Sequence, residues 1–140
     1  MPVREQKTSG NGYPPGCSAV WTNEHFTEGL SHYEAGRHWE AHESWEVLWR
    51  QTTDDQLRML MQGLIQIAAA CHKAYAQRDL ASAQRLFARA LDKFERLPDA
   101  VHGVDLARLR DDTEACRDVL EHDQDRGTLD ASRLPRVKPA

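Results

Sequence analysis

The sequence predicts an all-α fold, a single compact antiparallel bundle of about five helices. Apolar residues recur three and four positions apart through most of residues 22–126, which is the period of a helix with one buried face. Residues that favour helix N-caps precede these stretches, and Gly or Pro follows several of them. No stretch alternates between apolar and polar residues in the way that a half-buried strand does.

Five helical segments are expected in order along the chain. Their predicted ranges are 23–35, 37–51, 54–77, 80–97 and 106–122. The N-cap oxygens that we expect belong to Thr22 or Asn23, Thr53 or Asp54, Asp79 and Asp105. Gly36 closes the first segment, and Pro98 ends the fourth because proline cannot continue a helix.

The third segment is the longest and is expected to lie at the centre of the bundle. One of its stripes consists of Leu57, Leu60, Leu64, Ile67, Cys71 and Tyr75, and a second consists of Met59, Gly63, Ala70 and Ala74. Small residues let a neighbouring helix approach closely, while the large apolar stripe fills the main core. In the fourth segment one apolar face is formed by Ala83, Leu86, Phe87, Ala90, Leu91, Phe94 and Leu97.

A spacing found in tetratricopeptide helix hairpins occurs near the start of the bundle. Gly29 is followed by Ala41 twelve residues later and by Trp45 four residues after that. The pattern recurs forty-two residues further on, but a cysteine replaces the glycine and the period exceeds that of the repeat. The spacing therefore predicts antiparallel helix hairpins and not a true repeat array.

The chain length and composition fit one domain with two flanking segments. A chain of 140 residues with 40% hydrophobic and 29% charged residues can bury one ordinary core. Residues 1–21 are expected to form a loose N-terminal arm, residues 22–126 the helical domain, and residues 127–140 a mobile C-terminal tail.

The charge and the cysteines exclude several classes of partner and location. The net charge is −4, and 18 basic residues are scattered among 22 acidic ones, so nucleic acid is not expected as a partner. No apolar run resembles a signal peptide or a membrane span, which favours a cytoplasmic location without membrane contact. Cys17, Cys71 and Cys116 show no paired spacing and are expected to be reduced thiols.

The segment HWEAHESWEVLWR, residues 38–50, is the most distinctive part of the sequence. It holds three tryptophans within eleven residues, Trp39, Trp45 and Trp49. On a helix, Trp45 and Trp49 share the core-facing arc, whereas Trp39 lies off it. Aromatic residues at helical spacing favour a core role, and Trp39 is the exception, expected to cover another helix, a subunit interface or a pocket rim.

This segment resembles the domain-of-unknown-function 309 family. The family's hallmark is an EAHE-x-x-E-x-x-W helix followed by a QGLIQ-A-A helix, and both stand nearly intact at residues 40–49 and 62–70. The resemblance covers roughly residues 26–98. It implies a small multihelical bundle, but it carries no reaction with it, because the family has no established activity.

A ladder of polar side chains at four-residue steps follows one edge of the same helix. It consists of His38, His42 and Glu46. The structural interpretation is a buried imidazole and carboxylate that form hydrogen bonds with Gln62 or Gln66 of the next helix. The alternative is a divalent-metal site with His42 and Glu46 as ligands, completed by His72 or His38.

The short connection between the second and third segments predicts that these helices run antiparallel. We therefore expect one concave polar site bounded by His38, His42, Glu43, Glu46, Gln62, Gln66 and His72. If its role is structural, Gln66→Leu should cost about 1–3 kcal/mol because a buried partner loses its hydrogen bond, while Glu46→Gln should be mild. If it is a functional site, removing the carboxylate should leave the stability unchanged or raise it.

The sequence favours a non-enzymatic helical module that acts through self-association or a protein partner, with no cofactor. The alternative is a metal-dependent, hydrolase-like enzyme with Glu43 as general base beside His42 and Glu46. No nucleophile motif, phosphate-binding glycine loop or dinucleotide fingerprint supports another reaction.

Overall fold

The computed structural model describes residues 18–122 and 129–140, and it confirms the all-α bundle. Its helices are α1 (Ser18–Trp21), α2 (Glu24–Glu34), α3 (His38–Gln51), α4 (Asp55–Tyr75), α5 (Leu80–Glu95) and α6 (Leu106–His122). A hairpin of two-residue strands, β1 (Ala100–Val101) and β2 (Val104–Asp105), joins α5 to α6, and a short 3-10 helix, η2 (Ala131–Arg133), follows α6. The sequence analysis missed this hairpin because two residues are too few to show an alternating pattern.

The helices begin where the sequence places capping side chains. Asn23 accepts hydrogen bonds from the first free amides of α2, Asp54 accepts one from Leu57 in α4, and Asp79 accepts one from Ser82 in α5. These side chains satisfy amides that have no partner within the helix. The N-cap of α3 is Arg37, whose side chain makes no capping hydrogen bond.

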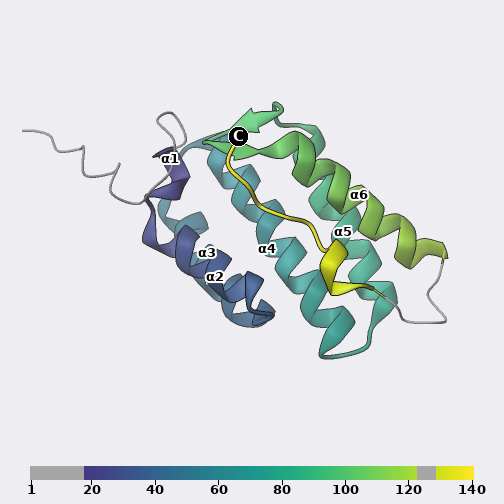
Figure 1. The fold of residues 1–140 in the computed structure, drawn as a ribbon. Coiled ribbons are helices and arrows are strands. Elements are labelled where there is room, and N and C mark those ends of the chain that lie inside the picture. The colour runs from purple at the N-terminus through teal and green to yellow at the C-terminus, as the bar shows by residue number, and fades with distance from the viewer. Residues whose placement is uncertain (1–17, 123–128) are drawn as a thin grey trace, which may run out of the picture.

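Successive helices pack against one another from α2 to α6, and α4 lies between α3 and α5 (Figure 1). This arrangement confirms the central position that the sequence predicts for the longest helix. The residues that α4 buries are Leu60, Met61, Gly63, Leu64, Ile67, Ala68, Ala70, Cys71 and Ala74. Helix α4 therefore buries side chains against both α3 and α5.

Two glycines mark places where helices come close together. A Cβ at Gly29 would lie 2.4 Å from Nε1 of the buried Trp45, so α2 and α3 approach as the tetratricopeptide-like spacing predicts. A Cβ at Gly63 would lie 2.3 Å from Cε1 of Phe94 on α5. The helix that approaches α4 at Gly63 is therefore α5, whose Phe94 ring fills this face.

The boundary expected for the N-terminal arm is wrong at its C-terminal end. Residues 1–17 lie outside the described residues, but Val20 and Trp21 belong to the buried core. The Trp21 indole donates a hydrogen bond of 2.7 Å to the Gly103 carbonyl in the hairpin. These contacts join α1 to a turn eighty residues away.

The C-terminal segment packs against the bundle over residues 129–140, which we call the strap. It runs back along the helices to the hairpin, where Val104 and Pro139 form an antiparallel bridge (Figure 1). Leu129 and Val137 are only 7% and 3% exposed. The expectation of a mobile tail does not describe these residues, because main-chain hydrogen bonds and separate apolar anchors hold them without any helical pattern.

Candidate functional site

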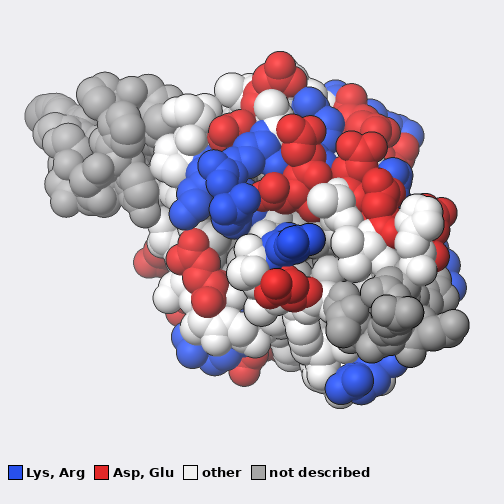
Figure 2. Space-filling view, turned by 45° about the vertical axis from the view of Figure 1, so that its right-hand side comes forward, with Lys and Arg blue, Asp and Glu red and all other residues white. Residues whose placement is uncertain are grey.

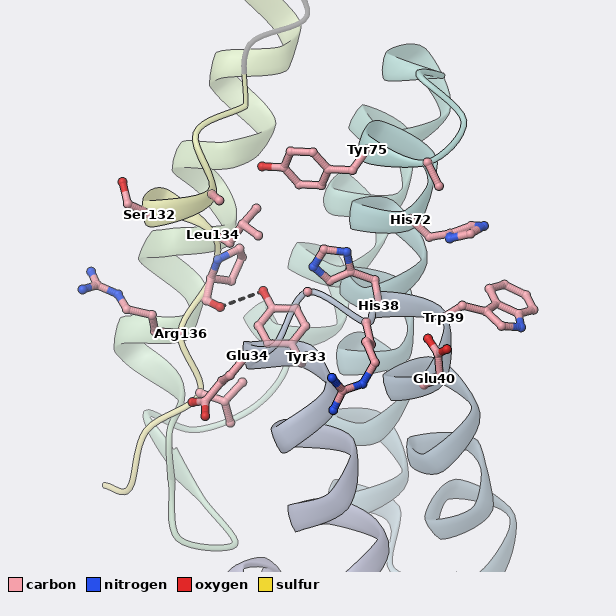
Figure 3. A pocket seen from close by; sticks show the side chains of 16 residues that line it. Tyr33, Glu34, His38, Trp39, Glu40, His72, Tyr75, Ser132, Leu134 and Arg136 are labelled. Atoms are coloured by element: carbon pink, nitrogen blue, oxygen red, sulfur yellow. Dashed lines mark hydrogen bonds between the residues drawn. The ribbon is translucent and has the colours of Figure 1, made fainter.

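A pocket of about 890 Å³ opens where the end of α2, the start of α3 and the end of α4 meet the strap (Figure 3). Its lining residues from the helices are Tyr33, Glu34, Gly36, Arg37, His38, Trp39, Glu40, His72, Tyr75 and Ala76, and those from the strap are Ala131, Ser132, Leu134, Pro135, Arg136 and Val137. Its size and its mixture of apolar and polar residues are typical of ligand or partner sites.

The inner wall of the pocket is aromatic. The His38 imidazole lies between two tyrosines, edge-on to Tyr33 at 5.7 Å and stacked on Tyr75 at 5.8 Å between ring centroids. The Tyr33 hydroxyl donates a hydrogen bond of 2.8 Å to the Pro135 carbonyl, and the Tyr75 hydroxyl donates one to the Leu129 carbonyl. Both tyrosines therefore line the pocket and hold the strap.

Desolvation determines the protonation of the side chains in this wall. Desolvation, followed by the effect of nearby thiols, raises the pKa of Tyr33 well above its usual value and that of Tyr75 to about 12. Desolvation, followed by the charge of His72, lowers the pKa of His38. At neutral pH the two phenols therefore remain hydrogen-bond donors, and the imidazole between them is uncharged.

Trp39 forms an exposed aromatic platform on the side of the pocket away from the strap (Figure 3). Its ring stacks on His42 with 4.6 Å between centroids and 7° between planes, and it lies 5.1 Å from the His72 ring. Among the residues that the structure describes, Trp39 and Tyr75 are the two exposed large hydrophobic side chains, at 46% and 40% exposure. Both line this pocket.

The exposed lining of the pocket carries charges of both signs. Arg37 and Arg136 contribute two guanidinium groups, and Glu34 and Glu40 contribute two carboxylates. The Arg37 Nε is bonded to His32 and the Arg136 Nε lies 3.5 Å from Asp112. The surface view in Figure 2 likewise shows acidic and basic side chains side by side on one face of the molecule.

The predicted contacts between His42 and the glutamines of α4 do not form. His42 Nδ1 and Gln66 Oε1 are both buried, and neither has a hydrogen-bond partner. The imidazole instead lies along α3, with its face on Trp39 and its Nε2 3.9 Å from Glu46. Glu46 accepts a hydrogen bond of 3.1 Å from Arg50, so its partner lies on α3 and not on α4.

The pocket brings together only part of the predicted polar site. His38 and His72 line it with Trp39, whereas His42, Glu43, Glu46, Gln62 and Gln66 do not. Glu43 and Gln62 are exposed, so Gln62 needs no buried partner. Sequence reasoning missed Tyr33 and the strap residues, and the only signal for Tyr75 was its place at the end of the α4 stripe.

The other two tryptophans of α3, Trp45 and Trp49, pack within the bundle and do not line the pocket. Trp45 is fully buried and donates a hydrogen bond of 3.1 Å to the Phe26 carbonyl of α2. Trp49 is half-buried, with the Arg58 guanidinium 4.6 Å from its ring centre. The core role that helical spacing favours therefore applies to Trp45, and the rim position applies to Trp39.

The geometry offers little support for a metal at His42 and Glu46. Across residues 18–122 and 129–140, no three His, Cys, Asp or Glu side chains lie close enough together to hold a metal ion. Catalytic zinc needs three protein ligands and an open position.

Within residues 18–122 and 129–140, no helix has both the length and the apolar character needed to cross a membrane.

One known protein family matches the part of the chain that contains α3. The model of the family described as a domain of unknown function (DUF309) matches residues 26–86, which run from α2 through α3 and α4 into α5. No curated protein matches the chain. The match includes the helical part of the pocket and excludes the strap, and the chain thus resembles a family whose description gives no activity.

Proposed function

We propose that this chain is a non-enzymatic interaction module that associates with a second copy of itself through the pocket face. The observation that carries this proposal is that Trp39 and Tyr75, the two exposed large hydrophobic residues of the described chain, line the same pocket. Exposed aromatic residues that gather beside a concave surface are typical of protein interfaces.

The rigidity of Trp39 supports its role as an anchor. Its ring is already stacked on His42 and flanked by His72. Association therefore costs less side-chain entropy at Trp39 than it would at a tryptophan that rotates freely. Tryptophan is also among the residues that contribute most to binding free energy in interfaces.

The charges around the pocket favour a second copy as the partner. A two-fold interface brings the same surface patch of each subunit together, so the patch must be complementary to itself. Arginine and glutamate side chains on one patch allow opposite charges to meet across such an interface. The proposal requires no cofactor.

Sedimentation equilibrium over a wide range of protein concentration tests this function. The wild-type chain should change reversibly from monomer to dimer, and Trp39→Ala should weaken the dimer by about 2 kcal/mol, which is about thirtyfold in the dissociation constant. Trp39→Phe should retain part of the affinity. Glu43→Ala, on the same helix outside the pocket, should dimerise like the wild type. A wild-type chain that stays monomeric, or a dimer that Trp39→Ala leaves intact, would refute the proposal.

A cytoplasmic location forms part of the same proposal. Cys71 and Cys116 are buried free thiols. Burial raises the pKa of Cys71 far above its usual value and that of Cys116 to about 12, so both suit a reducing compartment as unreactive core residues. Fractionation of cells that express a tagged chain tests the location, and recovery of the chain outside the cytoplasm would contradict it.

A further inference from the structure

The bundle holds the strap largely through the strap's main chain. Three side chains of the bundle donate hydrogen bonds to strap carbonyls, Tyr33 to Pro135, Tyr75 to Leu129 and Cys116 to Arg133. The donors come from α2, α4 and α6, which lie far apart in the sequence. Because each acceptor is a backbone carbonyl, these bonds do not depend on the identity of the strap's side chains.

The hairpin of β1 and β2 also binds the strap through main-chain hydrogen bonds. The Asp105 amide donates a hydrogen bond of 2.8 Å to the Lys138 carbonyl, and the Ala140 amide donates one of 2.9 Å to the Gly103 carbonyl. The strap thus adds a short extended segment to the edge of a two-stranded sheet, as peptides do when they bind by strand addition.

Apolar side chains anchor the strap at intervals. Leu129, Pro135 and Val137 are buried and Leu134 is half-buried, while residues 130–133 are exposed. A bound peptide has the same two components, main-chain hydrogen bonds that give affinity and separate apolar side chains that give specificity. The surface beneath the strap, which we call the strap groove, therefore has the features of a peptide-binding site.

We propose that the strap groove is a binding site for an extended peptide segment of a partner protein. The strap occupies this site within the same chain, so the partner segment carries apolar residues spaced like Leu129, Leu134 and Val137, and the strap competes with it. The strap groove and the dimer surface share Tyr75. They differ in that Tyr33 and Cys116 also donate hydrogen bonds to the strap, whereas Trp39 lies on the side of the pocket away from the strap (Figure 3).

The test uses a fluorescent twelve-residue peptide with the sequence of residues 129–140 and the full-length chain. In Val137→Ser the strap loses a buried apolar anchor. Lys138→Ser is the matched control, because it introduces serine at the neighbouring, exposed position. When the strap vacates the groove more often, the apparent affinity for an added peptide rises in proportion. Fluorescence anisotropy should show the peptide binding Val137→Ser about tenfold or more tightly than either the wild type or Lys138→Ser.

Two controls make the result specific. A peptide with serine at the position of Val137 should not bind, and Trp39→Ala should not change binding of the native peptide, which separates this proposal from self-association. Circular dichroism establishes that Val137→Ser is folded. If that folded variant binds the peptide no better than the wild type, the strap groove is not a peptide-binding site.

A second measurement keeps the proposal testable if Val137→Ser does not fold. The Cys116 thiol is 2% exposed and bonded to the strap, so its alkylation in the wild-type chain reports opening of the strap. Excess native peptide should slow the alkylation of Cys116, measured by mass spectrometry, whereas the serine-substituted peptide should not. An alkylation rate that the native peptide leaves unchanged would overturn the proposal.

Discussion

Replacing Gly63 by alanine should destabilise the bundle, although alanine is the better helix former. The added Cβ would lie 2.3 Å from Cε1 and 2.8 Å from Cζ of Phe94, closer than real contacts allow. Phe94 is fully buried in α5, so its ring has no free space into which to move. Helices α4 and α5 must then move apart.

The two opposing effects can be compared in size. An alanine in place of a glycine inside a helix stabilises by about 1 kcal/mol. Overpacking a tight core costs about 1–3 kcal/mol, and a contact this short with a fully buried ring belongs at the upper end. We therefore expect a net loss of about 1–2 kcal/mol in the free energy of unfolding.

Urea denaturation of four proteins measures this effect as a double-mutant cycle. The proteins are the wild type, Gly63→Ala, Phe94→Leu and the double variant. Without the aromatic ring, Gly63→Ala should be neutral or stabilising, because only the helix preference remains. If Gly63→Ala stabilises the wild-type background, or costs the same with and without Phe94, the close packing of α4 on α5 is wrong.

Three further predictions concern the strap, the unpaired amide and the histidine of the pocket. Val137→Ala should lower the free energy of unfolding by about 1.5–2.5 kcal/mol in urea denaturation, because a buried anchor loses two methyl groups. Lys138→Ala, at an exposed position, should be neutral. Equal effects of the two variants would mean that the strap is a mobile tail. Gln66→Leu should stabilise by about 1 kcal/mol in thermal melts, since Gln66 Oε1 is buried without a partner, and a loss of stability would show that the amide is bonded. The pKa of His38 is lowered in the folded state, so the unfolded chain binds its proton more readily and stability should fall as pH decreases through and below 6.5. Denaturation between pH 5 and 8 should show a weaker fall in His38→Gln than in the wild type and His122→Gln, and three equal slopes would contradict this assignment.

The Gln66 prediction reverses the expectation drawn from the sequence. That expectation assumed that polar residues at similar depths on antiparallel helices bond to one another. In the structure His42 stacks on Trp39 along its own helix, and Gln62 lies on an exposed face. Spacing along a helix predicts which residues share a face, but it does not predict which rotamer an aromatic neighbour selects.

Much of the bundle could be predicted because local signals determine it. The caps Asn23, Asp54 and Asp79 act where the sequence places them. Most of the α5 stripe is buried as its period predicts, at Ala83, Phe87, Ala90, Leu91 and Phe94. The place of Trp39 off the core arc predicted that it lies outside the main core, and its ring is exposed. Each of these features depends on neighbours within a few residues along the chain.

The pocket could not be predicted for the opposite reason. Tyr33 and Pro135 are 102 residues apart, and Tyr75 and Leu129 are 54 apart, and the bonds between them involve backbone carbonyls that every residue has. Such contacts leave no periodic pattern of side chains. The two-residue strands of the hairpin are likewise too short to show alternation.

Fluorine NMR of the chain labelled with 5-fluorotryptophan tests most directly whether the pocket face mediates self-association. Trp39→Phe assigns the Trp39 resonance among the four tryptophans. With increasing protein concentration, the Trp39 resonance should shift or broaden as the dimer forms, while those of the buried Trp21 and Trp45 remain unchanged. A dimer that forms while the Trp39 resonance stays constant, or a chain in which no resonance responds to concentration, would contradict the account.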